Sequence, residues 1–224
     1  MLAEIKTRYD ADKEAFLALG GRIDEERPII GEWGQSYSSD GQYLLMNLWA
    51  FKKIKQAAPA VHVDIGSQLQ LILFLSLYTR VEFVDIRYPG LRAQNVTYIK
   101  GSVTKLPYPD NSVESLSSLH VCEHIGLGRY GDEIDPDGFN KACRELYRVL
   151  KPGGRLYFAV PMGKDKVVFN AHRVISSRTL MAAFPRFDKV EFCGVTSAGL
   201  LLEDVPVNGL DGDDYGCGMV VLTK

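Results

Sequence analysis

The sequence has few cysteines and no spacing typical of a disulfide framework. Its 224 residues include only Cys122, Cys143, Cys193 and Cys217, and no two of them form a CxxC pair. In a chain of this length such isolated cysteines are expected to be reduced thiols. We therefore predict a cytoplasmic protein.

Long apolar runs and an excess of one charge are also missing. The longest apolar run, residues 69–78, is interrupted by Gln70 and Ser76, and it reaches about half of the roughly 20 residues that cross a bilayer. The amino terminus is charged throughout, unlike a secretory signal. Lys and Arg total 26 against 28 Asp and Glu, so the net charge is −2. Without a basic field to hold phosphates, we expect neither a nucleic acid nor a membrane as partner. We expect instead a small-molecule substrate, and a chain that is a monomer or a homodimer.

What is present is a composition typical of a globular protein, with 46% apolar and 10% aromatic residues. That is enough for one substantial core. There are no repeats and no low-complexity segments. We predict an amino-terminal helical extension over residues 1–59, with helices at 2–19 and 41–57, followed by one domain over residues 60–224.

Beyond residue 60, apolar strands alternate with helices. Strands are expected at 61–65, 81–86, 96–99, 113–121, 155–161, 190–195 and 219–223, and helices at 69–78, 135–150 and 177–184. This alternation predicts an α/β fold with a doubly wound, mostly parallel sheet of seven strands. Because the last strand follows a loop rather than a helix, we expect it to be antiparallel. Such sheets bind ligands at the carboxyl ends of their strands.

The ends of the first two strands carry the residues of a nucleoside site. The first ends in Asp64-Ile65-Gly66-Ser67, where the glycine lets the backbone turn and exposes helix amides to a small ligand. The second ends in Asp85, whose carboxylate can accept hydrogen bonds from both hydroxyls of a ribose. Alone, each residue is better explained as a turn glycine or a capping aspartate. Together, in register, they favour nucleoside binding.

The glycine-rich loops of phosphate-binding proteins are absent. A dinucleotide site needs G-x-G-x-x-G, whereas Gly66 is followed here by Gln68 and Gln70, and there is no P-loop. A pyrophosphate would be poorly held, but a nucleoside without phosphate would not need those glycines. A nicotinamide-dependent oxidoreductase is therefore disfavoured.

Over residues 60–224 the sequence resembles the class I S-adenosylmethionine-dependent methyltransferases. The resemblance lies in VHVDIGS, VEFVDIR, GSVTKLPYPDNSVESLSSLHVCEHI and ELYRVLKPGGRLYFAVP, in the order and spacing of that family. The segments QYLLMNLWAFKKI, VDIGS and HIGLGRYGDEIDPDG resemble a subgroup described only as a domain of unknown function. The resemblance implies a Rossmann-like methyltransferase fold, S-adenosylmethionine as cofactor, and residues 1–59 as a cap.

The resemblance also implies which residues contact the cofactor. They are Asp64, Gly66, Ser67, Asp85, Ile86, Ser102, Val103, Leu119 and His120. Asp64 and Gly66 would lie near the methionyl part, and Asp85 would hold the ribose. Ser102 and Val103 would flank the adenine, and Leu119 and His120 would lie beneath the sulfonium. Two departures are Gln68 and Gln70 in place of glycines, and Ser102 in place of an acidic residue facing the adenine amino group.

Three of the four histidines, His120, His124 and His172, follow strand ends. A histidine beside the cofactor can accept a proton from a hydroxyl as its oxygen attacks the methyl carbon. His120 is the first candidate base and His172 the second, although a structural role explains His120 equally well. Glu123 and His124 complete the catalytic candidates, but for this pair we favour a role in fixing the following loop.

The same four residues, His120, Glu123, His124 and His172, resemble positions at which some RNA 3′-end methyltransferases place metal ligands. Three imidazoles and a carboxylate could bind a divalent ion that polarises a substrate hydroxyl. Similar residues occur in relatives that need no metal, so our main expectation is a site without metal. The near-neutral net charge also weighs against an RNA substrate.

We therefore expect methyl transfer to an oxygen, less often a nitrogen, of a small polar molecule, with a sugar-containing molecule as first candidate. The main alternative is a non-catalytic binding protein that kept the fold. Two groups are candidates for substrate contact, the first because such folds often close a cap over the site, the second because it follows a strand end, although an ordinary surface loop explains the second equally well. They are Trp33, Tyr37, Gln42 and Tyr43 in the extension, and Arg129, Tyr130, Asp132 and Asp135 after the fourth strand.

Overall fold

The computed structural model describes residues 2–23, 26 and 41–224. The chain divides into two compact units, Met1–Ser39 and Asp40–Lys224. In the first unit the described residues form helix α1 (Leu2–Ala18), and Lys13 Nζ donates a 2.8 Å hydrogen bond to Glu26 Oε1. Trp33 and Tyr37, which we expect to contact the substrate, lie outside the described residues.

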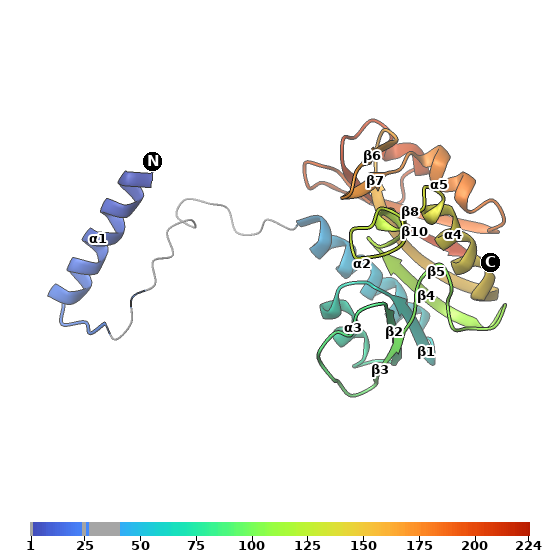
Figure 1. The fold of residues 1–224 in the computed structure, drawn as a ribbon, viewed down its shortest axis with the longest axis horizontal. Helices are drawn as coiled ribbons and strands as arrows, with labels where there is room; N and C mark the ends of the chain where they lie inside the picture. The colour runs from blue at the N-terminus through green and yellow to red at the C-terminus, as the bar shows by residue number, and fades with distance from the viewer. Residues whose placement is uncertain (1, 24–25, 27–40) are drawn as a thin grey trace. The chain divides into compact units, whose positions relative to one another are not determined.

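The second unit contains the sheet, its flanking helices and the site (Figure 1). Its elements are α2 (Gly41–Ala57), β1 (Val61–Ile65), α3 (Leu69–Leu75), β2 (Arg80–Asp85), β3 (Val96–Lys100), β4 (Val113–Leu119), η1 (Cys122–His124), α4 (Gly138–Val149), β5 (Leu150–Met162), β6 (Lys166–Val168), β7 (His172–Val174), α5 (Ser177–Ala183), β8 (Lys189–Val195), β9 (Leu201–Leu202), η2 (Val207–Leu210) and β10 (Gly216–Thr223).

The central sheet has the strand order β3-β2-β1-β4-β5-β10-β8-β9. Strands β3, β2, β1, β4 and β5 are mutually parallel, and β10 runs antiparallel between β5 and β8. The predicted doubly wound, mostly parallel sheet with an antiparallel last strand is confirmed. The sheet has eight strands and not the predicted seven, because Leu201 and Leu202 pair with β8 at its edge. Two residues are too few to give a recognisable alternation.

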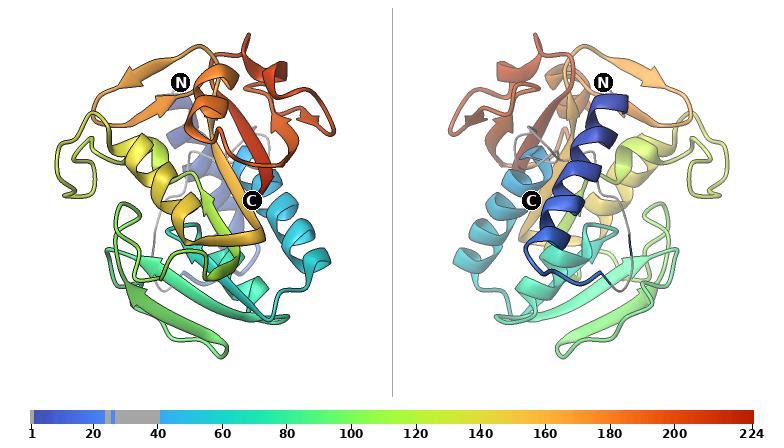
Figure 2. Two further views of the ribbon diagram at one scale, coloured as in Figure 1. Left: turned by 90° about the vertical axis from the view of Figure 1, so that its right-hand side faces the viewer. Right: turned by 90° about the vertical axis from the view of Figure 1, so that its left-hand side faces the viewer.

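Helices cover both faces of the sheet. On one face α2 and α3 bury Met46, Trp49 and Leu71 against Tyr157 and Met219. On the other, α4 and α5 pack apolar side chains against the opposite sides of the same strands; these are Phe139, Ala142, Cys143, Leu146, Val149 and Leu180. Figure 2 shows α2 and α4 on opposite sides of the strands. Burial on both faces explains the long apolar runs of the central strands β5 and β10, LYFAV and MVVL.

Helix α4 begins three residues later than predicted. Asp135 and Pro136 precede it, because the backbone N–H of Asp135 is bound to Gly126 O at 3.0 Å. A Cβ on Gly126 would clash with the carbonyl of Asp135, so the glycine permits this close approach. The segment before α4 is thereby tied to the loop that follows β4.

Two features that the sequence has little of can be compared with the structure. All four cysteines are free and buried, in agreement with reduced thiols. Within the described part of the chain, the helices are too short or too polar to cross a bilayer.

Candidate functional site

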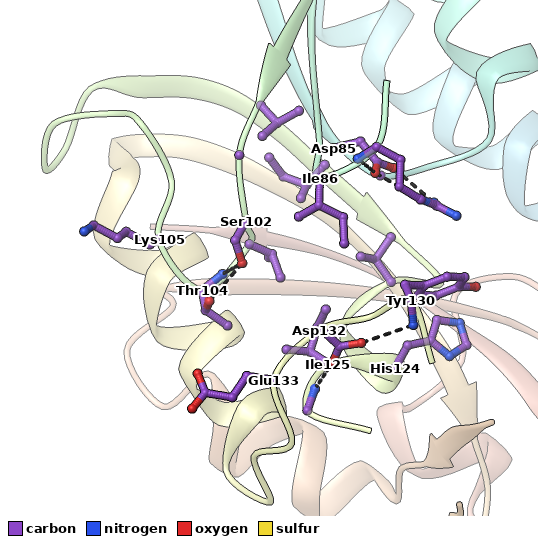
Figure 3. A pocket seen from close by; sticks show the side chains of 18 of the residues that line it. Asp85, Ile86, Ser102, Thr104, Lys105, His124, Ile125, Tyr130, Asp132 and Glu133 are labelled. Carbon is purple, nitrogen blue, oxygen red and sulfur yellow. Dashed lines mark hydrogen bonds and ion pairs between the residues drawn. The ribbon is translucent and has the colours of Figure 1, made fainter. Parts of the chain in front are cut away.

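A cavity of about 640 Å³ opens at the carboxyl ends of β1, β2, β3 and β4. The strand order reverses between β1 and β4, which is where doubly wound sheets bind ligands. The volume is typical of small-molecule sites, which span roughly 300–1,000 Å³. The predicted site residues that line it are Gly66, Asp85, Ile86, Ser102, Val103, His120 and His124. In Figure 3, Asp85 and Ser102 lie across the pocket from His124 and Asp132.

Gly66 makes the turn between β1 and α3. Its φ of +65° lies in the left-handed region, and its N–H donates to Val84 O at 2.9 Å. A Cβ at this position would lie 3.3 Å from Val121 Cγ2 and 3.6 Å from Asp85 Oδ2. Glycine is therefore favoured both by its conformation and by the close approach of its neighbours.

Asp64 is completely buried beneath this turn and does not line the cavity. Its Oδ1 accepts the Ser67 N–H at 3.0 Å, and its Oδ2 accepts the Ser117 hydroxyl. Burial raises the pKa of Asp64 to about 6, although the hydrogen bonds from Ser117 and Ser67 act in the opposite direction. Ser67 Oγ in turn accepts the Leu119 N–H at 3.2 Å. Asp64, Ser67 and Leu119 thus fix the turn from below.

His62 extends this buried network. Its Nδ1 lies 2.8 Å from Ser115 Oγ and its Nε2 lies 2.8 Å from Ser117 Oγ. Because Ser117 gives its one proton to Asp64, it must accept from Nε2–H of His62, and Nδ1 then accepts from Ser115. Burial lowers the pKa of His62 to about 3, which keeps the ring neutral. Sequence reasoning gave His62 no role. The signal was the matching spacing of His62-x-Asp64 and Ser115-x-Ser117.

Asp85 ends β2, and its carboxylate is held by Arg87. The Arg87 N–H and Nε–H donate to Oδ1 at 2.7 and 3.1 Å, and Nη2 donates to Oδ2 at 3.2 Å. The guanidinium also lies 4.5 Å from the ring centroid of Tyr130. Both oxygens expected to bind a ribose are therefore engaged by Arg87. Sequence reasoning missed Arg87, although the D-x-R spacing at a strand end was its signal.

The two departures from the family pattern leave the cavity open. Gln68 and Gln70 are exposed and do not line it, and Gln68 Oε1 accepts a 2.7 Å hydrogen bond from Asn47 Nδ2. Ser102 lines the cavity, with its Oγ 2.9 Å from Thr104 Oγ1. The larger side chains at the glycine positions therefore do not fill the space in which a nucleoside would lie.

His120 follows β4 with a left-handed backbone (φ +54°) and its ring is buried. Its Nδ1 lies 2.9 Å from Oε1 of the fully buried Glu123, and its Nε2 lies 3.3 Å from Cys217 Sγ. Burial lowers the pKa of His120, but Cys217 and Glu123 outweigh burial and raise it to about 10. His120 is therefore an imidazolium at neutral pH, with Nε2 hydrogen-bonded to Cys217 and Nδ1 at ion-pair distance from Glu123.

The other two candidate histidines differ from His120. His124 Nδ1 lies 2.6 Å from Ala171 O, and its Nε2 lies 3.6 Å from Glu123 Oε1. His172 is half-buried and packs against Tyr215, with ring centroids 4.9 Å apart. Burial and the neighbouring His124 lower the pKa of His172, which keeps it neutral at physiological pH. Glu123 and His172 do not line the cavity.

The metal alternative can be compared with the arrangement of these side chains. Throughout residues 2–23, 26 and 41–224, no three His, Cys, Asp or Glu side chains are grouped as metal ligands. His120 instead directs its two nitrogens to Glu123 and Cys217.

The loop after β4 is held together by its own acidic residues. Asp132 accepts hydrogen bonds from the backbone N–H groups of Gly126 at 2.7 Å and Tyr130 at 3.2 Å, and Asp135 accepts from Lys141 Nζ at 2.6 Å. Asp132 and Asp135, two of the predicted substrate contacts, therefore stabilise the conformation of this loop. Tyr130 keeps its ring at the cavity wall.

Solved structures share this arrangement of strands and helices. The N-methyltransferase NodS from Bradyrhizobium japonicum WM9, in complex with S-adenosyl-L-homocysteine, superposes with a TM-score of 0.58 at 11% identity, over 83% of this chain and 89% of that one. This chain has the class I methyltransferase fold. The [4+2]-cyclase SpnF also superposes with a TM-score of 0.58, at 16% identity, over 93% of this chain and 90% of that one.

Comparisons of the sequence match shorter segments of the chain than the structural superpositions do. A family model described as "Caenorhabditis protein of unknown function, DUF268" matches residues 104–202. The ubiquinone/menaquinone biosynthesis C-methyltransferase UbiE of Escherichia coli is 39% identical over 62 residues, which are 28% of this chain and 20% of that enzyme. The chain thus matches about a fifth of the length of these curated relatives. Both predicted resemblances, to class I methyltransferases and to a domain of unknown function, are confirmed.

Proposed function

We propose that this chain transfers the methyl group of S-adenosylmethionine to an oxygen, less often a nitrogen, of a small polar molecule. The observation that supports this most is the position of Gly66 and Asp85, side by side in one cavity at the reversal of strand order. The relatives named above include a C-methyltransferase and an N-methyltransferase. Because these relatives methylate different atoms, they do not indicate the acceptor of this chain. The polar side chains around the cavity favour a polar acceptor, and a sugar-containing molecule remains the first candidate.

The residues around the cavity fit the cofactor. The glycine turn gives room for the methionyl part, Asp85 offers two acceptors to the ribose hydroxyls, and Ser102 and Val103 lie where the adenine would be flanked. The exposed Gln68 and Gln70 leave that space free. When bound, the cofactor supplies a methyl group on a sulfonium that is already activated for in-line displacement.

The chain's own contribution is to position the acceptor and to take its proton. An effective base must be unprotonated at the working pH. The lowered pKa of His172 meets this condition, whereas His120 is protonated, with Nε2 bound to Cys217 and Nδ1 facing Glu123. We therefore favour His172 as the base for an acceptor that extends from the cavity past His124, because the His172 ring does not line the cavity itself. Its imidazole would take the hydroxyl proton as the oxygen forms its bond to the methyl carbon. His120 would form a fixed part of the cavity wall.

We propose that the amino-terminal extension, predicted over residues 1–59, contributes to the site through its second helix, α2, which belongs to the same compact unit as the sheet. In the described part of this segment, α2 contributes Gln42 and Tyr43. Gln42 Nε2 donates to Thr196 O at 3.1 Å and to Tyr215 O at 3.0 Å, and the Tyr43 ring centroid is 5.0 Å from that of His120. These contacts support a role for α2 on the substrate side of the site.

Calorimetry with S-adenosylhomocysteine tests the cofactor site. We expect the wild-type protein to bind, and Asp85→Ala to bind about ten- to a hundredfold more weakly, because hydrogen bonds to a charged group contribute about 1.5–3 kcal/mol. The exposed Asp214→Ala serves as the control and should bind like wild type. No binding by the wild-type protein at millimolar ligand would refute the proposal.

Turnover needs its own measurement, since a non-catalytic binding protein would also bind the ligand. The same fold occurs in a protein named as a [4+2]-cyclase, so the fold alone does not specify methyl transfer. Incubation with methyl-labelled cofactor and a panel of polyols and sugars should transfer label to one class. Tight binding with no transfer to any acceptor would favour the binding-protein alternative.

A further inference from the structure

Cys217 is brought to the site by the antiparallel last strand. Because β10 runs opposite to β4 and β5, its first residues lie at the carboxyl ends of those strands. Cys217 pairs there with Pro161 of β5, and its Sγ lies 3.3 Å from Nε2 of His120, ninety-seven residues earlier in the chain. A cysteine that the sequence presents as an ordinary buried thiol thus contacts a residue of the cavity wall.

The ring of His120 is held on three sides. Cys217 contacts Nε2, Oε1 of Glu123 lies 2.9 Å from Nδ1, and Tyr43 packs against the ring face at 5.0 Å. Cys217 and Glu123 are completely buried. The left-handed backbone of His120 is costly for a residue with a side chain, and such backbones persist where the surroundings hold them in place. Three independent contacts on one ring provide that support.

The charges around the ring favour its protonated form. A fully buried carboxylate needs a positive partner, and His120 supplies the nearest cationic nitrogen to Glu123, with His124 Nε2 farther away at 3.6 Å. The second N–H of an imidazolium needs an acceptor, which Cys217 Sγ supplies. Further titratable neighbours are Tyr43 on α2, Tyr215 before β10 and His172 on β7. Two guanidiniums also face the group: Arg173 Nη1 donates to Glu123 O at 3.3 Å, and Arg129 Nη1 lies 3.3 Å from His124 Nδ1. Burial and Glu123 raise the pKa of Tyr43 to about 12, and the pKa of Tyr215 is also raised, so both tyrosines are neutral.

We propose that Cys217 is a positioning residue of the methyl-transfer site, which together with Glu123 holds His120 as a fixed imidazolium in the cavity wall. Its role in transfer depends on the proposed function, whereas its hold on His120 does not. Removing the sulfur leaves one buried N–H without an acceptor, which favours loss of that proton and lets the ring rotate. His120 would then become a mobile neutral imidazole beside the reacting groups.

Titration of the histidine rings by NMR, in protein without cofactor, tests the hold on His120. In the wild type we expect His120 to stay protonated through neutral pH. In Cys217→Ala its pKa should fall, and in Cys217→Ser, whose hydroxyl is also an acceptor, the fall should be smaller. Cys193→Ala is the matched control, because Cys193 is a buried cysteine on the neighbouring strand β8. A His120 titration that is the same in Cys217→Ala and wild type would overturn the proposal.

Kinetics with an acceptor test the role in transfer. Cys217→Ala should lower kcat by about ten- to a hundredfold and change the shape of its pH profile, since a displaced wall group misaligns the reacting atoms. Its affinity for S-adenosylhomocysteine should change little, and Cys217→Ser should recover part of kcat. An unchanged kcat and pH profile in Cys217→Ala would overturn the positioning role.

The two proposals can fail separately. If the wild-type protein binds no S-adenosylhomocysteine, the proposed function fails, but the ring titration still decides whether Cys217 holds His120. If Cys217→Ala does not fold, the wild-type titration decides alone. A His120 ring that loses its proton below neutral pH would then overturn the proposal.

Discussion

Arg87 occupies the two carboxylate oxygens that a ribose would need on Asp85. Its guanidinium approaches them in the parallel geometry of an Arg–carboxylate pair and stacks on Tyr130. The Arg87 side chain is 58% exposed and that of Asp85 9% exposed. Because the Arg87 side chain lies largely in water, the pair is expected to contribute about 1 kcal/mol or less. A ribose can therefore displace Arg87, but it must overcome this contact.

Replacing Arg87 should strengthen ligand binding. We expect Arg87→Gln to bind S-adenosylhomocysteine about threefold more tightly, because the competing ion pair, worth at most about 1 kcal/mol, is gone. Added salt should also tighten binding to the wild type more than to the variant, since it screens the pair. Arg129→Gln is the control, because Arg129 contacts the Tyr130 ring without touching Asp85. Weaker binding by Arg87→Gln would mean that Arg87 contacts the ligand itself.

At the scale of elements, the turn from β1 into α3 is the part of the site most dependent on backbone conformation. Gly66 and Gly90 both have left-handed backbones, with φ of +65° and +71°. A Cβ on Gly66 would press against Val121 and approach Asp85, whereas a Cβ on Gly90 would meet nothing within 4 Å. Substituting each glycine in turn therefore distinguishes the effect of backbone strain from the effect of crowding in the site.

Both Gly66→Ala and Gly90→Ala should lower the free energy of unfolding by about 1–2 kcal/mol, because an alanine in the left-handed region is strained. Only Gly66→Ala should also weaken S-adenosylhomocysteine binding, by about tenfold or more, since Val121 and Asp85 must shift. Urea denaturation and calorimetry on both variants give the two quantities. Equal loss of affinity in both would show that the turn at Gly66 has no special part in binding.

Elements also explain which site residues the sequence could predict. Gly66, Asp85, Ser102 and His120 each end or follow a parallel strand, and parallel strands bring such positions to one edge of the sheet. Cys217 could not be placed in this way. Its contact with His120 depends on the register of an antiparallel strand far along the chain, which no local pattern encodes.

Asp64 and Ile65 show how the side of a strand determines whether a residue reaches the cavity. Asp64 was predicted to contact the cofactor, but it lies one residue inside the end of β1, where it is fully buried and hydrogen-bonded to Ser117 of β4. Its neighbour Ile65 reaches the cavity instead.

The short hairpin of β6 and β7, which carries His172, is not predicted from the sequence, because three-residue strands give no periodic signal.

At the scale of the whole molecule, His62 and Asp64 affect stability against pH in opposite directions. The folded-state pKa of Asp64, about 6, lies above its ordinary 3.8. The stability it contributes is therefore fully present below about pH 4 and is lost as the pH rises through about 6. The folded-state pKa of His62, about 3, lies below its ordinary 6.5. Its contribution is present above about pH 6.5 and is lost as the pH falls toward 3. Between these limits the two slopes oppose each other.

Replacing Asp64 should leave the slope of His62 uncompensated. Relative to wild type, Asp64→Asn should gain about 3 kcal/mol of unfolding free energy between about pH 4 and pH 6.5, because a shift of about two pKa units is removed. Urea denaturation at a series of pH values measures this difference, in which all other titrating groups cancel. The exposed Asp214→Asn should run parallel to wild type. Parallel curves for Asp64→Asn as well would mean that Asp64 ionises like an exposed aspartate. The donors and acceptors assigned to the buried hydrogen bonds from Ser115 through His62 and Ser117 to Asp64 would then be wrong.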